Sequence, residues 1–168
     1  MNDFLNQVWW GNPVKNYLLI IGIIFFVWVL KRFISRYIAG LLYGLVHKIW
    51  RNIEKKSFIN LVVKPLGLFL AVLVSIIALY KLKFPEEIDV DVYKFTAKDI
   101  FHSGGNIILI VTFTGLLLRI IDFVALILER RANFTPDLSD NQLIVFFKDF
   151  FKAILVIIGI MLVLRYAF

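Results

Sequence analysis

The sequence contains no cysteine, only two histidines and several long stretches without any charged side chain. Without cysteine the chain forms no disulfide bond, has no thiolate nucleophile and cannot bind a metal through sulfur. The histidines, His47 and His102, are isolated, and no suitably spaced carboxylate completes a metal site around either of them. We therefore expect no metal site and no cofactor.

Catalytic motifs are missing as well. The sequence has no glycine-rich phosphate-binding loop, no HExxH pattern and no serine nucleophile with a plausible base nearby. We therefore expect no catalytic residues, and we expect that the protein is not an enzyme.

Apolar residues dominate the chain. Hydrophobic residues make up 61% of it, whereas ordinary soluble domains contain about 45–50% apolar residues. A helix of a soluble domain also needs a polar face. Four runs carry no charge at all and so have no such face: Asn16 to Leu30, Pro65 to Tyr80, Ser103 to Leu118 and Ala153 to Leu164. The composition predicts an all-α membrane protein.

Each charge-free run is somewhat shorter than the roughly 20 residues that span a bilayer core. Basic residues at the run ends extend the spans, because their aliphatic stems can lie in lipid while the charges reach the headgroups. We predict a single transmembrane domain over residues 1–168, with an outer loop at 82–96. The predicted spans lie at about 14–32, 62–81, 100–124 and 145–165.

The distribution of basic residues predicts the orientation. If the N-terminus is outside, thirteen of the 19 lysines and arginines fall at the inner side, as the positive-inside rule requires. With four spans, the C-terminus is then outside too. The net charge of +7 would also suit nucleic acid, but anionic lipid headgroups explain basic residues along a membrane face. We expect membrane lipids as partners and no nucleic acid.

Residues 33–52 follow the first span with apolar pairs every four residues. This pattern predicts an amphipathic helix along the inner membrane interface, and Trp50 at its end is a candidate for lipid contact. Gly40 and Gly44 form a GxxxG pattern, which can let another helix approach closely. The alternative is that they are two small residues on the face of an interfacial helix.

The third helix is expected to be long. Thr96 and Asp99 resemble a capping box, so the helix should begin near Ala97, and it continues to Arg131 over about 52 Å. Arg119 and Asp122 are three residues apart and can pair. An intramembrane charge pair is a candidate functional site such as a proton relay, but this one lies toward the inner end and more simply marks the headgroup level.

The fourth helix should start at Ser139, which forms a capping box with Gln142. Its charges Lys148, Asp149 and Lys152 all lie in the inner part of the span. Both lysines are expected to reach toward the inner headgroups and tie the helix to lipid.

The run DNQLIVFFKDFFKAILVIIGIMLVLRYAF, preceded by LLLRIIDFVALILERRAN, resembles the membrane region of MscS-like small-conductance mechanosensitive channels, in particular extended bacterial members with extra N-terminal helices. The resemblance implies a multi-pass protein of the bacterial inner membrane, heptameric in the family, that opens under membrane tension and releases ions and small solutes on osmotic downshock. It also implies that the pore helix and the cytoplasmic domain would follow Phe168.

On this interpretation a set of charged and aromatic residues is the candidate site for contact with lipid and tension: Arg119, Asp122, Lys148, Asp149, Lys152 and Trp50. Gly40 and Gly44 are the candidates for helix packing. Two alternatives stay open: a small four-helix accessory or assembly protein of the membrane, and half of a transporter. A transporter half would show interrupted helices with polar residues at the midplane, whereas the second span carries no charged residue from Pro65 to Tyr80.

Overall fold

The computed structural model describes residues 2–49, 54–83, 91–92, 95–132 and 138–167, and the side chains of residues 4–31, 54–83, 96–130 and 141–167. Most of this chain is helical, which confirms the all-α class, and two short hairpins accompany the helices. In chain order the elements are α1 (Asn2–Asn6), β1 (Val8–Trp9), β2 (Asn12–Pro13), α2 (Val14–Ile49), α3 (Lys55–Phe58), the π-helix η1 (Ile59–Val63), α4 (Lys64–Tyr80), β3 (Asp91–Val92), β4 (Phe95–Thr96), α5 (Ala97–Ala132) and α6 (Leu138–Ala167).

Within the described residues, three helical segments are long and apolar enough to cross a membrane: Val14–Lys31, Lys55–Tyr80 and Ala97–Arg130. The fourth predicted span, 145–165, lies inside α6, which is a continuous helix of 30 residues but is not one of these three. Four spans with an interfacial helix therefore stay a prediction, whereas the three apolar segments agree with a membrane protein.

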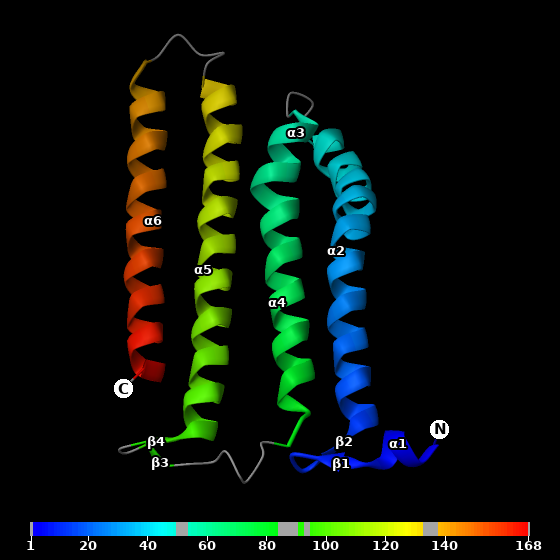
Figure 1. Cartoon of the computed structure of the whole chain (residues 1–168). Coiled ribbons are helices and arrows are strands. Elements are labelled where there is room, and N and C mark those ends of the chain that lie inside the picture. Colours follow the sequence, from blue (N-terminus) through cyan, green and yellow to red (C-terminus); the bar gives the residue numbers. More distant parts are fainter. Residues whose placement is uncertain (1, 50–53, 84–90, 93–94, 133–137, 168) are drawn as a thin grey trace.

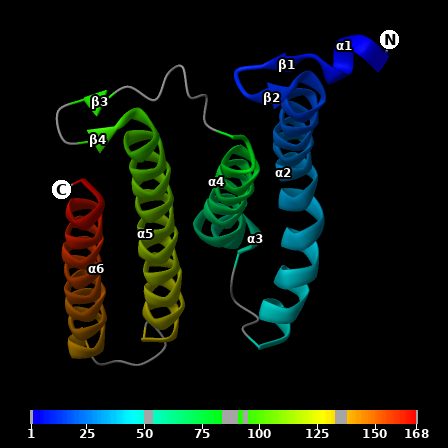
Figure 2. The same cartoon turned by 90° about the horizontal axis from the view of Figure 1, so that it is seen from below.

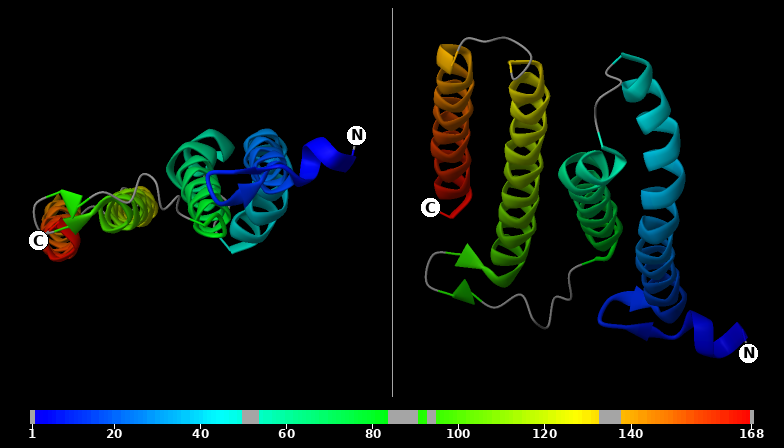
Figure 3. Two further views of the ribbon diagram at one scale, coloured as in Figure 1. Left: turned by 60° about the horizontal axis from the view of Figure 1, so that its bottom comes forward. Right: turned by 90° about the horizontal axis from the view of Figure 1, so that it is seen from above.

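The long helices stand side by side in a single row. Seen almost end-on, their order is α6, α5, α4 and α2 (Figure 3), and each packs against its neighbour in that order. Successive long helices run in opposite directions, so α1 and the C-terminal end of α6, although they belong to opposite ends of the row, lie on the same side of the layer, at the bottom of Figure 1. An open row leaves both faces of the helices uncovered, and most of their large apolar side chains are accordingly exposed.

Helix α2 joins two predicted elements. The span expected at 14–32 and the amphipathic helix expected at 33–52 form one uninterrupted helix to Ile49. Its second half, drawn in cyan, turns away from the direction of the first half (Figures 1 and 2). Gly40 and Gly44 lie in this second half, where the structure describes the backbone alone, and Trp50 lies outside the described residues.

The helical stretch that contains Pro65 begins well before α4. It starts at Lys55 and passes through the π-helix η1, at whose end the Lys64 amide donates to the Ile59 carbonyl five residues back. A proline inside a helix lacks an amide donor and crowds the carbonyl four residues before it. The wider π turn shifts the hydrogen-bond ladder by one residue just before Pro65, which allows the helix to continue.

Helix α5 begins where the sequence predicts. The Asp99 amide donates to Thr96 Oγ1 at 3.2 Å, and the Thr96 amide donates to Asp99 Oδ2 at 3.3 Å. This reciprocal pair satisfies two amides at the helix start, and the capping box is confirmed. Helix α6 begins at Leu138, one residue before the expected Ser139.

The N-terminal hairpin is attached to the end of α4 through Asn12. Trp10 and Gly11 between β1 and β2 both have positive φ, 45° and 71°, as a two-residue hairpin loop of the primed type requires. The buried Asn12 side chain donates to the Lys83 carbonyl at 2.7 Å and accepts from the Lys83 amide at 2.9 Å. Hydrogen bonds therefore link the chain just before the N-terminus of α2 to the chain just after the C-terminus of α4.

Helices α4 and α5 approach closely near the same end. Tyr80 Oη donates to the His102 carbonyl at 2.9 Å, and the two rings lie 4.6 Å apart. The Tyr80 hydroxyl occupies the space that a Cβ at position 105 would take, since the two would be 2.5 Å apart. Glycine at this position is what allows the tyrosine to cross onto α5.

A small core lies at the opposite end, where the stretch that includes α3 and η1 packs on α5. Phe58, Val63, Phe123 and Ile127 are buried there together, and the Phe58 and Phe123 rings meet edge to face at 5.4 Å. This end carries the charged side chains described next.

Candidate functional site: a charged network between two helices

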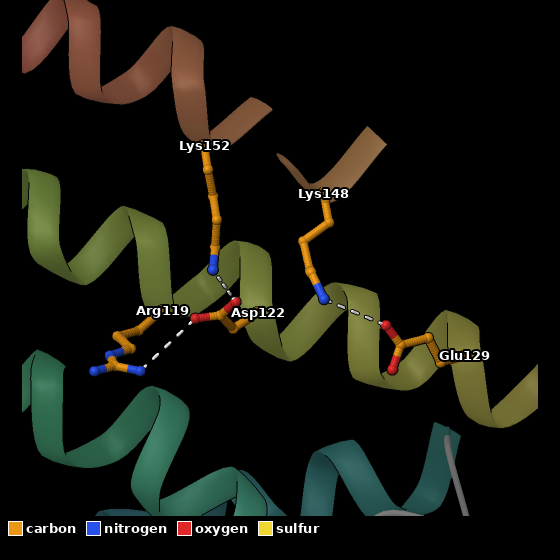
Figure 4. A network of polar contacts seen from close by, with 5 residues as sticks. All are labelled: Arg119, Asp122, Glu129, Lys148 and Lys152. Carbon is orange, nitrogen blue, oxygen red and sulfur yellow. Dashed lines mark ion pairs between the residues drawn. The ribbon is translucent and has the colours of Figure 1, made fainter. Parts of the chain in front are cut away.

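Charged side chains from α5 and α6 face one another across the boundary between the two helices (Figure 4). On α5, Asp122 and Glu129 are seven residues apart, which places them two turns apart on one face. On α6, Lys148 and Lys152 are four residues apart and also share a face. Because the helices are antiparallel, Lys152 lies opposite Asp122 and Lys148 lies opposite Glu129.

Three ion pairs join these groups. Lys152 Nζ pairs with Asp122 Oδ1, and Lys148 Nζ lies 3.5 Å from Glu129 Oε1. Arg119 Nη1 lies 3.8 Å from Asp122 Oδ2 on the same helix, as the spacing of three residues predicts. Asp122 is therefore shared between a lysine of α6 and an arginine of its own helix.

Burial makes Asp122 the centre of the network. Its side chain is 21% exposed, against 59% for Arg119. A carboxylate removed from water is unfavourable unless cations and hydrogen-bond donors compensate for the lost hydration. Two cations from opposite sides supply that compensation, so Asp122 fixes the register of α6 on α5.

A second contact confirms this register farther along the two helices. A Cβ at position 159 of α6 would lie 2.9 Å from Thr114 Oγ1 and 3.0 Å from Thr114 Cγ2. Only glycine fits at Gly159 without displacing the threonine, and small residues of this kind allow membrane helices to approach closely. Gly159 follows Lys152 by about two turns and Thr114 precedes Asp122 by about two turns, as an antiparallel pair requires.

The structure brings together four of the six predicted site residues: Arg119, Asp122, Lys148 and Lys152. Asp149 is exposed, and Lys152 pairs across to Asp122 rather than to this residue on its own helix. Trp50 lies outside the described residues. The ammonium groups of both lysines face carboxylates of α5, and their contact with lipid headgroups stays a prediction.

Sequence reasoning missed Glu129, the partner of Lys148. The signal was present in the spacing, because the two acids share one face of α5 and the two lysines share one face of α6, but which acid lies opposite which lysine depends on the direction of the neighbouring helix. It also missed Gly159, whose role depends on the residue that faces it.

A further ion pair extends the attachment of α5 to the neighbouring helical stretch. Arg130 Nη2 lies 3.3 Å from Glu54 Oε1, just before α3. Together with the contact between Phe58 and Phe123, it joins α5 to the start of the second apolar segment.

The network is suited to holding helices together and to carrying charge at a membrane surface. Among the described residues, histidines and acids form no group of three that could hold a metal ion. The absence of a metal site and of enzymatic activity stays a prediction.

Comparison with known proteins gave no matching family model, no matching curated protein and no matching solved structure.

Proposed function

We propose that this chain is the tension-sensing transmembrane region of an MscS-like mechanosensitive channel in the bacterial inner membrane. In this proposal α2, α4, α5 and α6 all span the bilayer, and the N-terminus is outside. The resemblance of the α5 and α6 sequences to that family motivates the proposal, and the arrangement of the helices supports it.

The observation that carries the proposal is the open, single-layer row of helices (Figure 3). A closed bundle hides much of its apolar surface, whereas this row exposes apolar side chains along its length, among them Phe25, Trp28, Ile77 and Val111. Lateral tension does work in proportion to the change in the area that a protein occupies in the membrane. Tension therefore favours the state with the larger area, as a ligand favours the state that it binds more tightly.

Helices α5 and α6 form the unit that would transmit such a force. The ion pairs at Asp122 and Glu129 and the close contact at Gly159 hold the two helices together. We expect them to tilt together, because separating them would leave Asp122 without its partner on α6. The outward side of α6 exposes large apolar residues, including Phe146, Ile157 and Met161. In the proposed channel this side meets further helices or other subunits of a homo-oligomer, a heptamer by family resemblance.

The direction of the helices agrees with this assignment. Helix α1 and the C-terminal end of α6 lie on one side of the layer of helices, at the bottom of Figure 1, and the basic residues Lys55, Lys56 and Arg130 lie near the opposite helix ends. If the basic end faces the cytoplasm, a helix that follows α6 would run inward, where the family has its soluble domain.

The test is electrical. The protein is expressed with every segment that its gene encodes, in giant spheroplasts of a bacterium that lacks its own mechanosensitive channels, and suction is applied to excised patches. We expect stepwise currents that rise with suction. Patches that hold the protein but stay silent up to membrane rupture would contradict the proposal and favour the accessory-protein alternative.

A further inference from the structure

An apolar groove of about 1680 Å³ lies between α2, α4 and α5. Phe25 of α2, Leu68 of α4 and Val111 of α5 are among the residues that line it. The volume exceeds the range of about 300–1,000 Å³ that is typical of sites for drug-sized molecules. A larger apolar occupant is needed to fill it.

Three cationic side chains, Lys31, Lys64 and Arg119, also line the groove. They lie toward one end of it, because α2 and α5 run in one direction and α4 in the other. Lys31 and Arg119 come after the apolar lining residues of their helices, and Lys64 comes before Leu68, with Asn60 and Leu61 lining the groove beyond it. None of the described residues that line the groove is acidic.

Arg119 is oriented for this role by the network at Asp122. Lys152 approaches the Asp122 carboxylate from α6, and Arg119 lies on the other side of it (Figure 4). Because Asp122 already has a lysine partner and the arginine pair is long at 3.8 Å, the guanidinium remains 59% exposed. It can therefore interact with a second anion on the side of the groove.

The length of the groove matches one leaflet of a bilayer. From Val111 to Arg119 the helix rises by about 12 Å, and from Ile21 to Lys31 by about 15 Å, at 1.5 Å per residue. Half of a hydrocarbon core is about 15 Å thick. A lipid whose phosphate lies at the three cations would lay its acyl chains along the apolar part of the groove.

We propose that this groove is a binding site for an anionic phospholipid, with the headgroup phosphate at Lys31, Lys64 and Arg119. The charge of the groove end selects an anionic headgroup, and its apolar walls select a lipid over a free phosphate. The proposal rests on the embedding of the chain in a membrane and not on gating by tension, so a failure of either proposal leaves the other standing.

Lipid retention tests the charged end. The full-length protein is purified in mild detergent, incubated with dioleoyl phosphatidylglycerol or dioleoyl phosphatidylcholine, and examined by native mass spectrometry. The double variant Lys64→Gln/Arg119→Gln should lose at least fivefold in bound phosphatidylglycerol. The control Lys55→Gln/Lys56→Gln removes the same charge from exposed positions outside the groove and should lose less than twofold. Equal losses in the two variants, or equal retention of the two lipids by the unaltered protein, would overturn the proposal.

Filling the groove tests the apolar part. Gly115 lines the groove, and a Cβ at this position meets no atom within 4 Å, so Gly115→Leu should fold and place its side chain in the space of the lipid. We expect at least a threefold loss of bound phosphatidylglycerol. Gly104→Leu is the matched control, because Gly104 is equally open but lies outside the groove. Unchanged retention in Gly115→Leu would show that the lipid binds elsewhere.

Discussion

The two outer helix pairs of the row are held together in different ways. Helices α5 and α6 are joined by ion pairs at Asp122 and Glu129 and by the close contact at Gly159. Helices α2 and α4 meet through apolar side chains beside the groove, and the bonds of Asn12 to Lys83 link them at one end. The α5–α6 pair is therefore held together along much of its length, whereas polar contacts hold the α2–α4 pair only at the end near Asn12 and Lys83.

This difference matters because lipid tails are as apolar as leucine and provide no hydrophobic drive for helix association. In a membrane, specific polar contacts and close backbone approach decide which helices stay together. We therefore expect α5 and α6 to behave as one rigid unit, and we expect the distance between α2 and α4 to vary more easily. A lipid in the groove would be sensitive to that distance.

The largest effect is expected from a disulfide between α5 and α6. The Cβ of Thr114 lies 3.5 Å from the Cβ position of residue 159, within the range of about 3.5–4.5 Å that disulfides require. The variant Thr114→Cys/Gly159→Cys also removes the crowded threonine atoms. We expect nearly complete oxidation, measured as loss of labelling by a maleimide reagent. The natural chain has no cysteine and gives no background.

The matched control for the disulfide is Gly115→Cys/Gly159→Cys. Gly115 follows Thr114 in sequence but lines the groove on the other side of α5, so both cysteines should remain available to the reagent. Equal labelling of the two double variants would mean that α5 and α6 do not have the described register.

A smaller effect is expected from Asp122→Asn. The neutral amide leaves Lys152 and Arg119 without their shared carboxylate, and the loss of a partly buried charged partner lowers the free energy of unfolding by about 1–3 kcal/mol. Urea unfolding in detergent micelles, followed by circular dichroism, measures the change. Asp149→Asn removes the same charge from an exposed position of α6 and should change stability little. If both variants lose the same stability, Asp122 has no special role at the boundary.

Local signals in the sequence were enough to predict many parts of the fold. The helical class follows from the composition and the long charge-free runs, whereas the start of α5 at the Thr96 and Asp99 capping box and the pairing of Arg119 with Asp122 depend on residues within one helical turn of each other. The helical stretch that contains Pro65 begins at Lys55, earlier than the predicted span at about 62–81. The helix tolerates the proline through a π turn, which no nearby residue type indicates.

The contacts between helices were harder to predict. The pairing of Lys148 with Glu129 depends on which helix lies beside α6, and the need for glycine at positions 105 and 159 depends on Tyr80 and Thr114 of the neighbouring helices. A single sequence shows that a glycine is present but not what faces it. The same reason explains why the groove was missed, since its lining comes from three helices.

The boundary between α4 and α5 joins the α5–α6 pair to the α2–α4 pair. The variant Gly105→Ala tests this boundary and has the smallest expected effect. The new methyl group would lie 2.5 Å from Tyr80 Oη, so the tyrosine must move away from the His102 carbonyl. The loss of that hydrogen bond, about 1 kcal/mol, offsets the gain in helix propensity of about 1 kcal/mol. Gly104→Ala keeps the gain in helix propensity, because a Cβ there meets no atom within 4 Å.

The free energies of unfolding of the two variants, measured in urea, should differ by about 1 kcal/mol. The difference should shrink in a Tyr80→Phe background, where the hydroxyl that causes the clash is gone. Equal stability at both positions would mean that α4 and α5 lie farther apart here, and that α5 is tied to the rest of the row by other contacts, such as the Phe69 and Phe113 rings 5.3 Å apart and the pairs of Phe58 and Glu54.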